Sequence, residues 1–147
     1  KSVIKSNQKR KILLTKRVSK ILSNKIKNKK IAILGVTFKA NTDDMRESSS
    51  LVLISYLLKK GALVSYYDPS GPKKELKKNK NIKFKDNLLE VCKGVDLVII
   101  NTEWDEFKSV DFKKAVGKNN FKIYDLRNLY NPNELKKKSI KYFSVGR

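Results

Sequence analysis

VDLVIIN, at residues 95–101, is a strongly apolar run that ends on a polar side chain. A strand with apolar side chains on both of its faces is typical of a parallel sheet, because helices cover both faces of such a sheet. A second run, KIAIL at residues 30–34, has the same character and is closed by Gly35. Both runs therefore predict buried strands of one sheet.

Strand-like and helix-like segments alternate along the rest of the chain. We expect four further strands, at residues 62–67, 82–85, 121–125 and 140–144. We expect helices at residues 8–27, 45–60, 87–93 and 133–138, and a helix or a turn followed by a helix at 104–116. This alternation predicts the α/β class, with a parallel sheet that carries helices on both faces and follows an N-terminal helix.

The helix expected at residues 45–60 has recognisable start and stop signals. Asp44 precedes it and Glu47 follows three residues later, which matches a capping box. Gly61 directly after the helix suits the left-handed residue that ends many helices. We therefore expect Asp44 to cap this helix and Gly61 to end it.

The helix expected at residues 8–27 has an apolar stripe at helical spacing, with lysines on its other face. The stripe consists of Ile12, Leu13, Val18, Ile21, Leu22 and Ile26. Because this helix cannot bury the stripe alone, we expect it to pack on another domain or another chain. A membrane-surface helix would suit the lysines, but the stripe lacks aromatic side chains.

The chain has 147 residues, enough for one domain, and a formal charge of +21 from 35 basic and 14 acidic residues. Residues 1–30 contain 12 of the basic residues and no acidic one. Such an arm could bind nucleic acid through the phosphates. However, 30 of the 35 basic residues are lysine, whereas phosphate readers favour arginine. We therefore interpret the charge as a compositional bias.

Several classes of protein and site are excluded by composition. The hydrophobic fraction of 39% excludes a disordered tail over most of the length, and no apolar run is long enough to cross a bilayer. The absence of histidine excludes His-dependent triads and His-ligated metal sites, and we predict no metal site. Cys92 has no second cysteine to pair with, and we expect it to be a buried structural thiol.

The start of the chain carries no secretory signal, and together with the single cysteine this predicts a cytoplasmic location. The chain begins at Lys1 rather than at methionine. We therefore expect it to be part of a longer polypeptide or a processed one.

Polar and charged side chains follow three of the expected strands, at residues 35–46, 101–104 and 125–128. The carboxyl ends of parallel strands meet at one edge of the sheet, and ligands of such folds bind there. We therefore expect these three segments to contribute to one site.

The first of these segments contains two cations, Lys39 and Arg46, beside Asp43 and Asp44. Lys39 could bind a phosphate or a sugar hydroxyl, and Arg46 could bind a second anion with its planar fork. Alternatively, both belong to a surface loop with local ion pairs, such as Arg46 with Asp43. The loop is not a dinucleotide fingerprint, because Gly35 is not followed by the second and third glycines of that motif.

The other two segments are NTEWDEF and DLRN. Trp104 and Phe107 of the former are expected to be lid or core residues. Arg127 of the latter directly follows an apolar strand, where a charged side chain does not suit the core. Arg127 therefore either pairs with Asp125 or faces a ligand at the edge of the sheet.

ILGVTFKANTDDMRESS, YYDP, NTEWDEF, YDLRNLYNP and the closing YFSVGR occur in this order along the chain. Together they resemble the C-terminal domain of the UDP-glucose/GDP-mannose dehydrogenase family. The resemblance covers about residues 30–147, and residues 1–29 match the end of the family's central linking and dimerisation helix. TEWDEF, DLRN and the terminal GR favour the UDP-glucose 6-dehydrogenase branch of the family.

The resemblance implies a degenerate Rossmann-like fold and a UDP-sugar-binding role for residues 30–147. The complete enzymes oxidise UDP-glucose to UDP-glucuronate with two NAD, which an N-terminal domain binds, and they form homodimers or higher homo-oligomers. Phe38 and Lys39 match the family's FK pair, which contacts the UDP-sugar, and Arg127 matches an arginine that faces it. Arg46 matches the arginine that reaches NAD from this domain.

The chain lacks the family's NAD fingerprint and the segment with the catalytic cysteine, and Cys92 lies in a different place. We therefore expect no catalytic residue here and no oxidation by this chain alone. One alternative is a sister dehydrogenase that acts on UDP-N-acetylmannosamine or GDP-mannose. The other, from a different class, is a non-catalytic basic module that binds nucleic acid.

Overall fold

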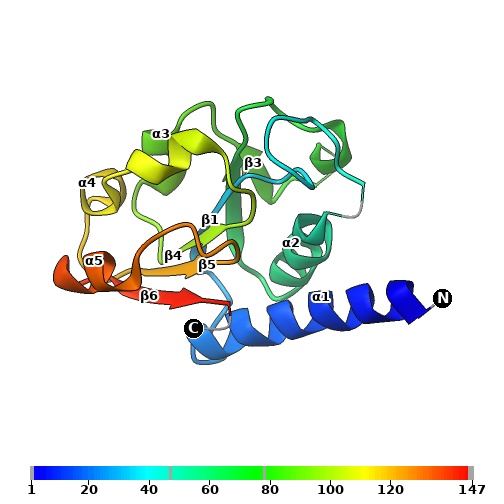
Figure 1. The fold of residues 1–147 in the computed structure, drawn as a ribbon, viewed down its shortest axis with the longest axis horizontal. Helices are drawn as coiled ribbons and strands as arrows, with labels where there is room; N and C mark the ends of the chain where they lie inside the picture. Colours follow the sequence, from blue (N-terminus) through cyan, green and yellow to red (C-terminus); the bar gives the residue numbers. More distant parts are fainter. Residues whose placement is uncertain (1, 47, 78, 146–147) are drawn as a thin grey trace.

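Six strands form a single sheet in the order β3-β2-β1-β4-β5-β6 in the computed structural model, which describes residues 2–46, 48–77 and 79–145 (Figure 1). All neighbouring strands are parallel. The strands are β1 (Lys30–Leu34), β2 (Leu63–Tyr67), β3 (Ile82–Phe84), β4 (Leu97–Ile100), β5 (Lys122–Asp125) and β6 (Lys141–Ser144). The order reverses between β1 and β4, so the loops after these two strands diverge at the middle of the sheet. Ligands of doubly wound folds bind at this switch point.

The helices between the strands confirm the expected alternation. They are α1 (Ser2–Ile21), α2 (Ser49–Lys59), α3 (Leu88–Cys92), α4 (Phe112–Val116) and α5 (Pro132–Lys137). The segment expected to be a helix or a turn plus a helix is a short 3-10 helix, Asp105–Ser109, followed by α4. The predicted α/β class is therefore confirmed.

Two hydrophobic cores lie on opposite faces of the sheet. Successive side chains of a strand point to opposite faces, so β1 contributes Ile31 and Ile33 to one core and Ala32 and Leu34 to the other. The first core contains buried side chains of α1 and α2, and the second contains those of α3, α4 and α5. Phe107 is fully buried in the second core, which confirms it as a core residue.

The start of α2 differs from the sequence prediction. The N-cap is Ser48, whose side chain accepts a hydrogen bond from the backbone N–H of Ser50. Asp44 instead accepts hydrogen bonds from the backbone and guanidinium of Arg46, and Glu47 lies outside the described residues. Gly61 has φ +88°, which confirms the expected left-handed end of this helix.

The end and the packing of α1 also differ from the prediction. The helix begins at Ser2 rather than at residue 8. It ends at Ile21 rather than at residue 27, because Ser23 and Asn24 adopt positive φ angles that cannot continue it. The stripe residues Val18 and Ile21 are buried against α2 and the sheet of this same domain. In the middle of the helix the side chains of Ile12 and Leu13 are 51% and 60% exposed. Only this part of the stripe remains available to another domain or chain.

Candidate functional site

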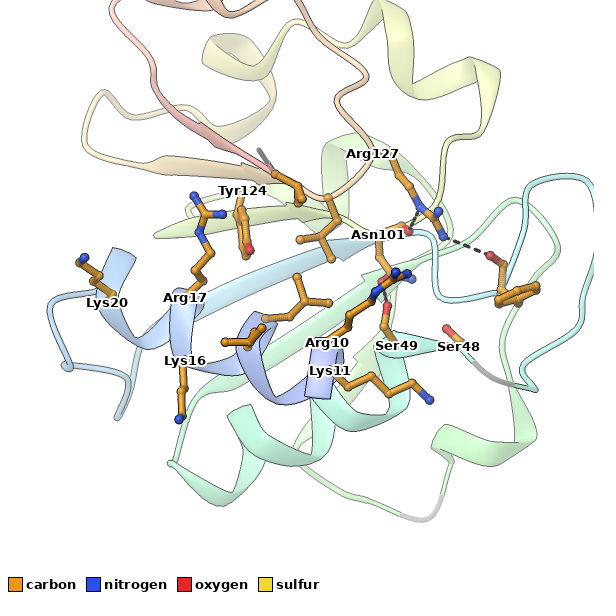
Figure 2. Close-up of a pocket in the computed structure, with 15 residues that line it drawn as sticks. Arg10, Lys11, Lys16, Arg17, Lys20, Ser48, Ser49, Asn101, Tyr124 and Arg127 are labelled. Atoms are coloured by element: carbon orange, nitrogen blue, oxygen red, sulfur yellow. Dashed lines mark hydrogen bonds between the residues drawn. The ribbon is translucent and has the colours of Figure 1, made fainter. Parts of the chain in front are cut away.

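A cavity of about 830 Å³ lies between α1, the start of α2 and the carboxyl ends of the central strands (Figure 2). We call it the α1 cavity. Six cationic side chains line it, namely Arg10, Lys11, Lys16, Arg17, Lys20 and Arg127. Among the described residues no carboxylate lines it. The cavity therefore favours an anionic ligand.

Arg127 is held at the edge of the α1 cavity by two backbone carbonyls. Its Nε donates to the carbonyl of Asn101 at 2.9 Å, and its Nη2 donates to the carbonyl of Phe38 at 3.2 Å (Figure 2). These carbonyls belong to the loops after β4 and β1, so Arg127 spans the switch point of the sheet. Because both partners are neutral, the positive charge remains available to an anion.

Asp125 does not pair with the guanidinium of Arg127. Its carboxylate is fully buried and accepts hydrogen bonds from the backbone N–H groups of Arg127, Leu129 and Tyr130 and from the hydroxyl of Tyr142, at 3.0, 2.7, 3.1 and 2.6 Å. These bonds shape the loop between β5 and α5. Of the two alternatives for Arg127, the side-chain pairing with Asp125 is therefore wrong, and the side chain faces the cavity.

The loop after β1 is fixed by buried polar contacts. Asp68, directly after β2, accepts hydrogen bonds from the backbone N–H groups of Val36 and Thr37 at 2.8 and 3.3 Å. The hydroxyls of Ser48 and Ser50 both donate to the carbonyl of Val36, at 2.7 and 2.6 Å. These contacts anchor the base of the loop that carries Phe38 to the cavity edge.

Of the four residues that the sequence singles out for binding, two lie at the cavity. Phe38 and Arg127 line it. Lys39 is exposed, and its Nζ lies 5.8 Å from the centroid of the Phe38 ring. Arg46 is exposed and pairs with Asp44 at 3.1 Å, and this contact lowers the pKa of the Asp44 carboxyl. Neither Lys39 nor Arg46 lines the cavity, and the local ion pair of Arg46 is with Asp44 rather than Asp43.

The structure adds residues that the sequence interpretation did not single out. Arg10 and Arg17 line the cavity from α1, and Ser49 lines it from the start of α2. Asn101 lines it from the residue after β4, and Tyr124 lines it from β5. The hydroxyl of Ser49 donates to the side-chain oxygen of Asn101 at 2.9 Å. A signal for the two arginines is their spacing of seven residues, which places both on one face of a helix.

The described residues do not form a complete dinucleotide site. The loop after β1 has no second glycine that would let a pyrophosphate approach the backbone. Asp68 lies at the strand end where dinucleotide-binding folds use an acidic residue for the ribose, but it is engaged by the backbone of this loop. The loop after β1 therefore offers no glycine-rich backbone cradle for a pyrophosphate.

Cys92 is fully buried on α3, as expected for a structural thiol. Burial raises the pKa of this thiol to about 12, so it is protonated at neutral pH and a poor nucleophile.

Residues 2–46, 48–77 and 79–145 contain neither a metal-binding cluster nor a membrane-spanning helix. No three His, Cys, Asp or Glu residues there cluster in a way that could hold a metal ion. No helix there combines the length and the apolar composition needed to cross a membrane.

The strand order and the switch-point cavity define a Rossmann-like α/β domain. Residues 32–132 match the family model described as the UDP binding domain of the UDP-glucose/GDP-mannose dehydrogenase family. The chain belongs to this family, which confirms the resemblance noted from its sequence.

Relatives support the same assignment. The chain is 37% identical over 148 residues to UDP-glucose 6-dehydrogenase of Rickettsia bellii (strain RML369-C), covering 99% of this chain and 34% of the relative. It is 31% identical to UDP-glucose 6-dehydrogenase 4 of Arabidopsis thaliana, covering 100% of this chain and 36% of the relative. The chain thus spans about a third of the length of these relatives.

Solved structures agree on the fold. An NDP-N-acetyl-D-galactosaminuronic acid dehydrogenase from Methanosarcina mazei Go1 matches with a TM-score of 0.77 and 29% identity over 94% of this chain and 29% of that one. A UDP-glucose dehydrogenase from Pyrobaculum islandicum matches with a TM-score of 0.76 over 96% of this chain and 30% of that one. At 23% identity the second match shows the fold alone.

Proposed function

We propose that this chain is the UDP-sugar-binding part of a UDP-glucose 6-dehydrogenase. The observation that carries the proposal is Arg127, whose guanidinium is held by two neutral carbonyls at the edge of a cationic cavity. The family match and the names of the relatives support the choice of a UDP-sugar as the anion. The NAD domain and the catalytic cysteine then belong to the rest of the enzyme.

The positions of the side chains support a role for each of the four residues in this proposal. Phe38 and Arg127 contact the nucleotide sugar inside the α1 cavity, which both of them line. Lys39 follows Phe38 on the same exposed loop, so we place it at the outer end of the ligand. Arg46 contacts NAD that is bound mainly elsewhere, and it exchanges its ion pair with Asp44 for that contact.

Residues 1–29 form the end of a linking and dimerisation helix in this proposal, and residues 30–147 form the UDP-sugar-binding domain. Exposed Ile12 and Leu13 on α1 support a contact with the rest of the enzyme or with a second subunit. The assembled enzyme is a homodimer or a higher homo-oligomer.

Replacement of Arg127 tests this proposal. Arg127→Lys keeps the charge but loses the planar fork, so we expect UDP to bind about 10- to 100-fold more weakly, the equivalent of one or two charge-assisted hydrogen bonds. Calorimetric titration of the complete polypeptide with UDP measures the change. Lys136→Ala, on the exposed face of α5, is the control and should bind UDP as the unchanged protein does. Equal affinity of the Arg127 variant would contradict the assignment.

The alternative of a GDP-mannose dehydrogenase is tested in the same titration. Tighter binding of UDP than of GDP supports a UDP-sugar as the substrate class. Tighter binding of GDP would replace it with a GDP-sugar, without changing the role of Arg127.

A further inference from the structure

Tyr142, on β6, reaches the loop that carries Arg127 from the far side of the sheet. Its side chain packs against the second core, whereas Tyr124 and Leu126, which line the α1 cavity, pack with the first core. Tyr142 itself does not line the cavity. Its hydroxyl donates to the carboxylate of Asp125 at 2.6 Å. The most direct route from Tyr142 to a ligand in the cavity therefore runs through Asp125.

The two oxygens of Asp125 hold both ends of this loop. Oδ2 accepts hydrogen bonds from the Tyr142 hydroxyl and from the backbone N–H groups of Leu129 and Tyr130, at 2.6, 2.7 and 3.1 Å. Oδ1 accepts one from the backbone N–H of Arg127 at 3.0 Å. The Tyr142 hydroxyl also lies 3.3 Å from the carbonyl oxygen of Tyr130. Tyr142 therefore joins the carboxylate to the far end of the loop.

The carboxylate of Asp125 depends on these hydrogen bonds. It is fully buried, and it belongs to none of the ion pairs that the described residues form. Hydrogen bonds must then replace the water that a buried carboxylate loses. Three of its four donors are backbone N–H groups of the loop itself, so Tyr142 is the one donor from another element. Within the loop Asn128 has a φ of +53°, which a residue other than glycine adopts at an energetic cost.

We propose that Tyr142 is a positioning residue for Arg127. Its hydroxyl holds the Asp125 carboxylate, the carboxylate keeps the loop wound, and the loop places the Arg127 guanidinium at the edge of the α1 cavity. The guanidinium donates to the carbonyls of Asn101 and Phe38, and a shift of its backbone would lengthen both bonds. This inference rests on the proposed function, in which Arg127 binds the nucleotide sugar.

The variant Tyr142→Phe removes the hydroxyl and keeps the ring in the core. Calorimetric titration of the complete polypeptide with UDP measures its effect. We expect about threefold to tenfold weaker binding, a smaller loss than for Arg127→Lys because the guanidinium is retained. The matched control is Ile140→Val, which trims a side chain buried in the same core just before β6. It should bind UDP as the unchanged protein does.

A double-mutant cycle separates positioning from a general loosening of the fold. If Tyr142 acts through Arg127, its loss matters only while a planar fork is present to be oriented. We therefore expect Tyr142→Phe to weaken UDP binding by about twofold or less when it is made together with Arg127→Lys. A merely structural role would give the same fold-change with and without Arg127→Lys.

Amide hydrogen exchange of the ligand-free polypeptide gives a second readout that does not depend on UDP. We expect the amides of residues 127–130 to exchange about tenfold faster in Tyr142→Phe, because the carboxylate that they bond loses its outside anchor. The amides of β4 should exchange at the rate of the unchanged protein, because the sheet keeps its hydrogen bonds.

Three outcomes would overturn the role of Tyr142. They are unchanged UDP affinity of Tyr142→Phe, the same fold-change with and without Arg127→Lys, and equally faster exchange in β4 and in residues 127–130. If the unchanged protein does not bind UDP, or if Arg127→Lys binds it equally well, the proposed function itself fails. That result is read from proteins without the Tyr142 substitution, so the two failures are distinct.

Discussion

Two buried carboxylates at strand ends act on the backbone rather than on a ligand. Asp68 accepts hydrogen bonds from the loop after β1, and Asp125 accepts them from the loop after β5. Each is almost completely buried. In the sequence Asp68 stands in YYDP and Asp125 in YDLRN, two of the segments that carry the family resemblance. In the structure they position Phe38 and Arg127.

At the residue scale, Gly35 marks the closest approach between the segments that follow β1 and β4. Its φ is +80°, and an added Cβ would lie 2.5 Å from the Cβ of Thr102. We expect Gly35→Ala to lower the free energy of unfolding by about 2–4 kcal/mol, because overpacking adds to backbone strain.

Urea unfolding measures this loss. The matched control is Gly117→Ala, because Gly117 has a φ of +74° but no atom within 4 Å of the added Cβ. It should cost about 1 kcal/mol, which is the backbone strain alone. Equal losses for the two variants would mean that the contact with Thr102 contributes nothing.

At the scale of elements, strands were easier to predict than helix ends. The runs that form β1 and β4 are apolar on both faces. A short segment that is apolar on both faces is typical of a buried parallel strand, so few other structures fit it. The start of α2 was missed because Asp44 and Ser48 are both good caps. The choice between them depends on the carbonyl of Val36, a tertiary partner of Ser48 that the local pattern does not contain.

The starts of β1 and β4 are joined by Asp96, which accepts a hydrogen bond from the backbone N–H of Lys30 at 2.9 Å and pairs with Lys118 at 2.7 Å. Burial raises the pKa of Asp96, but the hydrogen bonds from Lys118 and Lys30 outweigh it, so the net pKa lies below the ordinary value of 3.8. A lowered folded-state pKa contributes stability above pH 3.8, and this stability is lost as pH falls through the lowered pKa.

We therefore expect Lys118→Met to reduce the free energy of unfolding by about 0.5–1 kcal/mol at pH 6, because the pair is partly exposed and screened. The difference from the unchanged protein should shrink as pH falls below 3.8. Urea unfolding at several pH values measures it. Lys108→Met is the control, since the pair of Lys108 with Asp105 is mostly exposed. A difference that stays constant down to pH 2 would contradict the role of Asp96.

At the scale of the whole molecule, the sequence predicted where the site lies but only part of what lines it. Arg127 is predicted because it follows an apolar strand at the edge of the sheet, whereas Phe38 is predicted only from the resemblance to the family. Arg10 and Arg17 were missed because their helix looked like a basic surface and its packing against the sheet edge is a long-range contact. Tyr124 was missed because an aromatic residue inside a strand normally indicates core.

In the proposed function the α1 cavity holds UDP with its diphosphate on Arg127. A crystal structure of the complete polypeptide with UDP tests this most directly. We expect phosphate oxygens within hydrogen-bond distance of the Arg127 guanidinium, with the cavity occupied by the nucleotide. Ordered UDP at another surface, with the α1 cavity empty, would contradict the account.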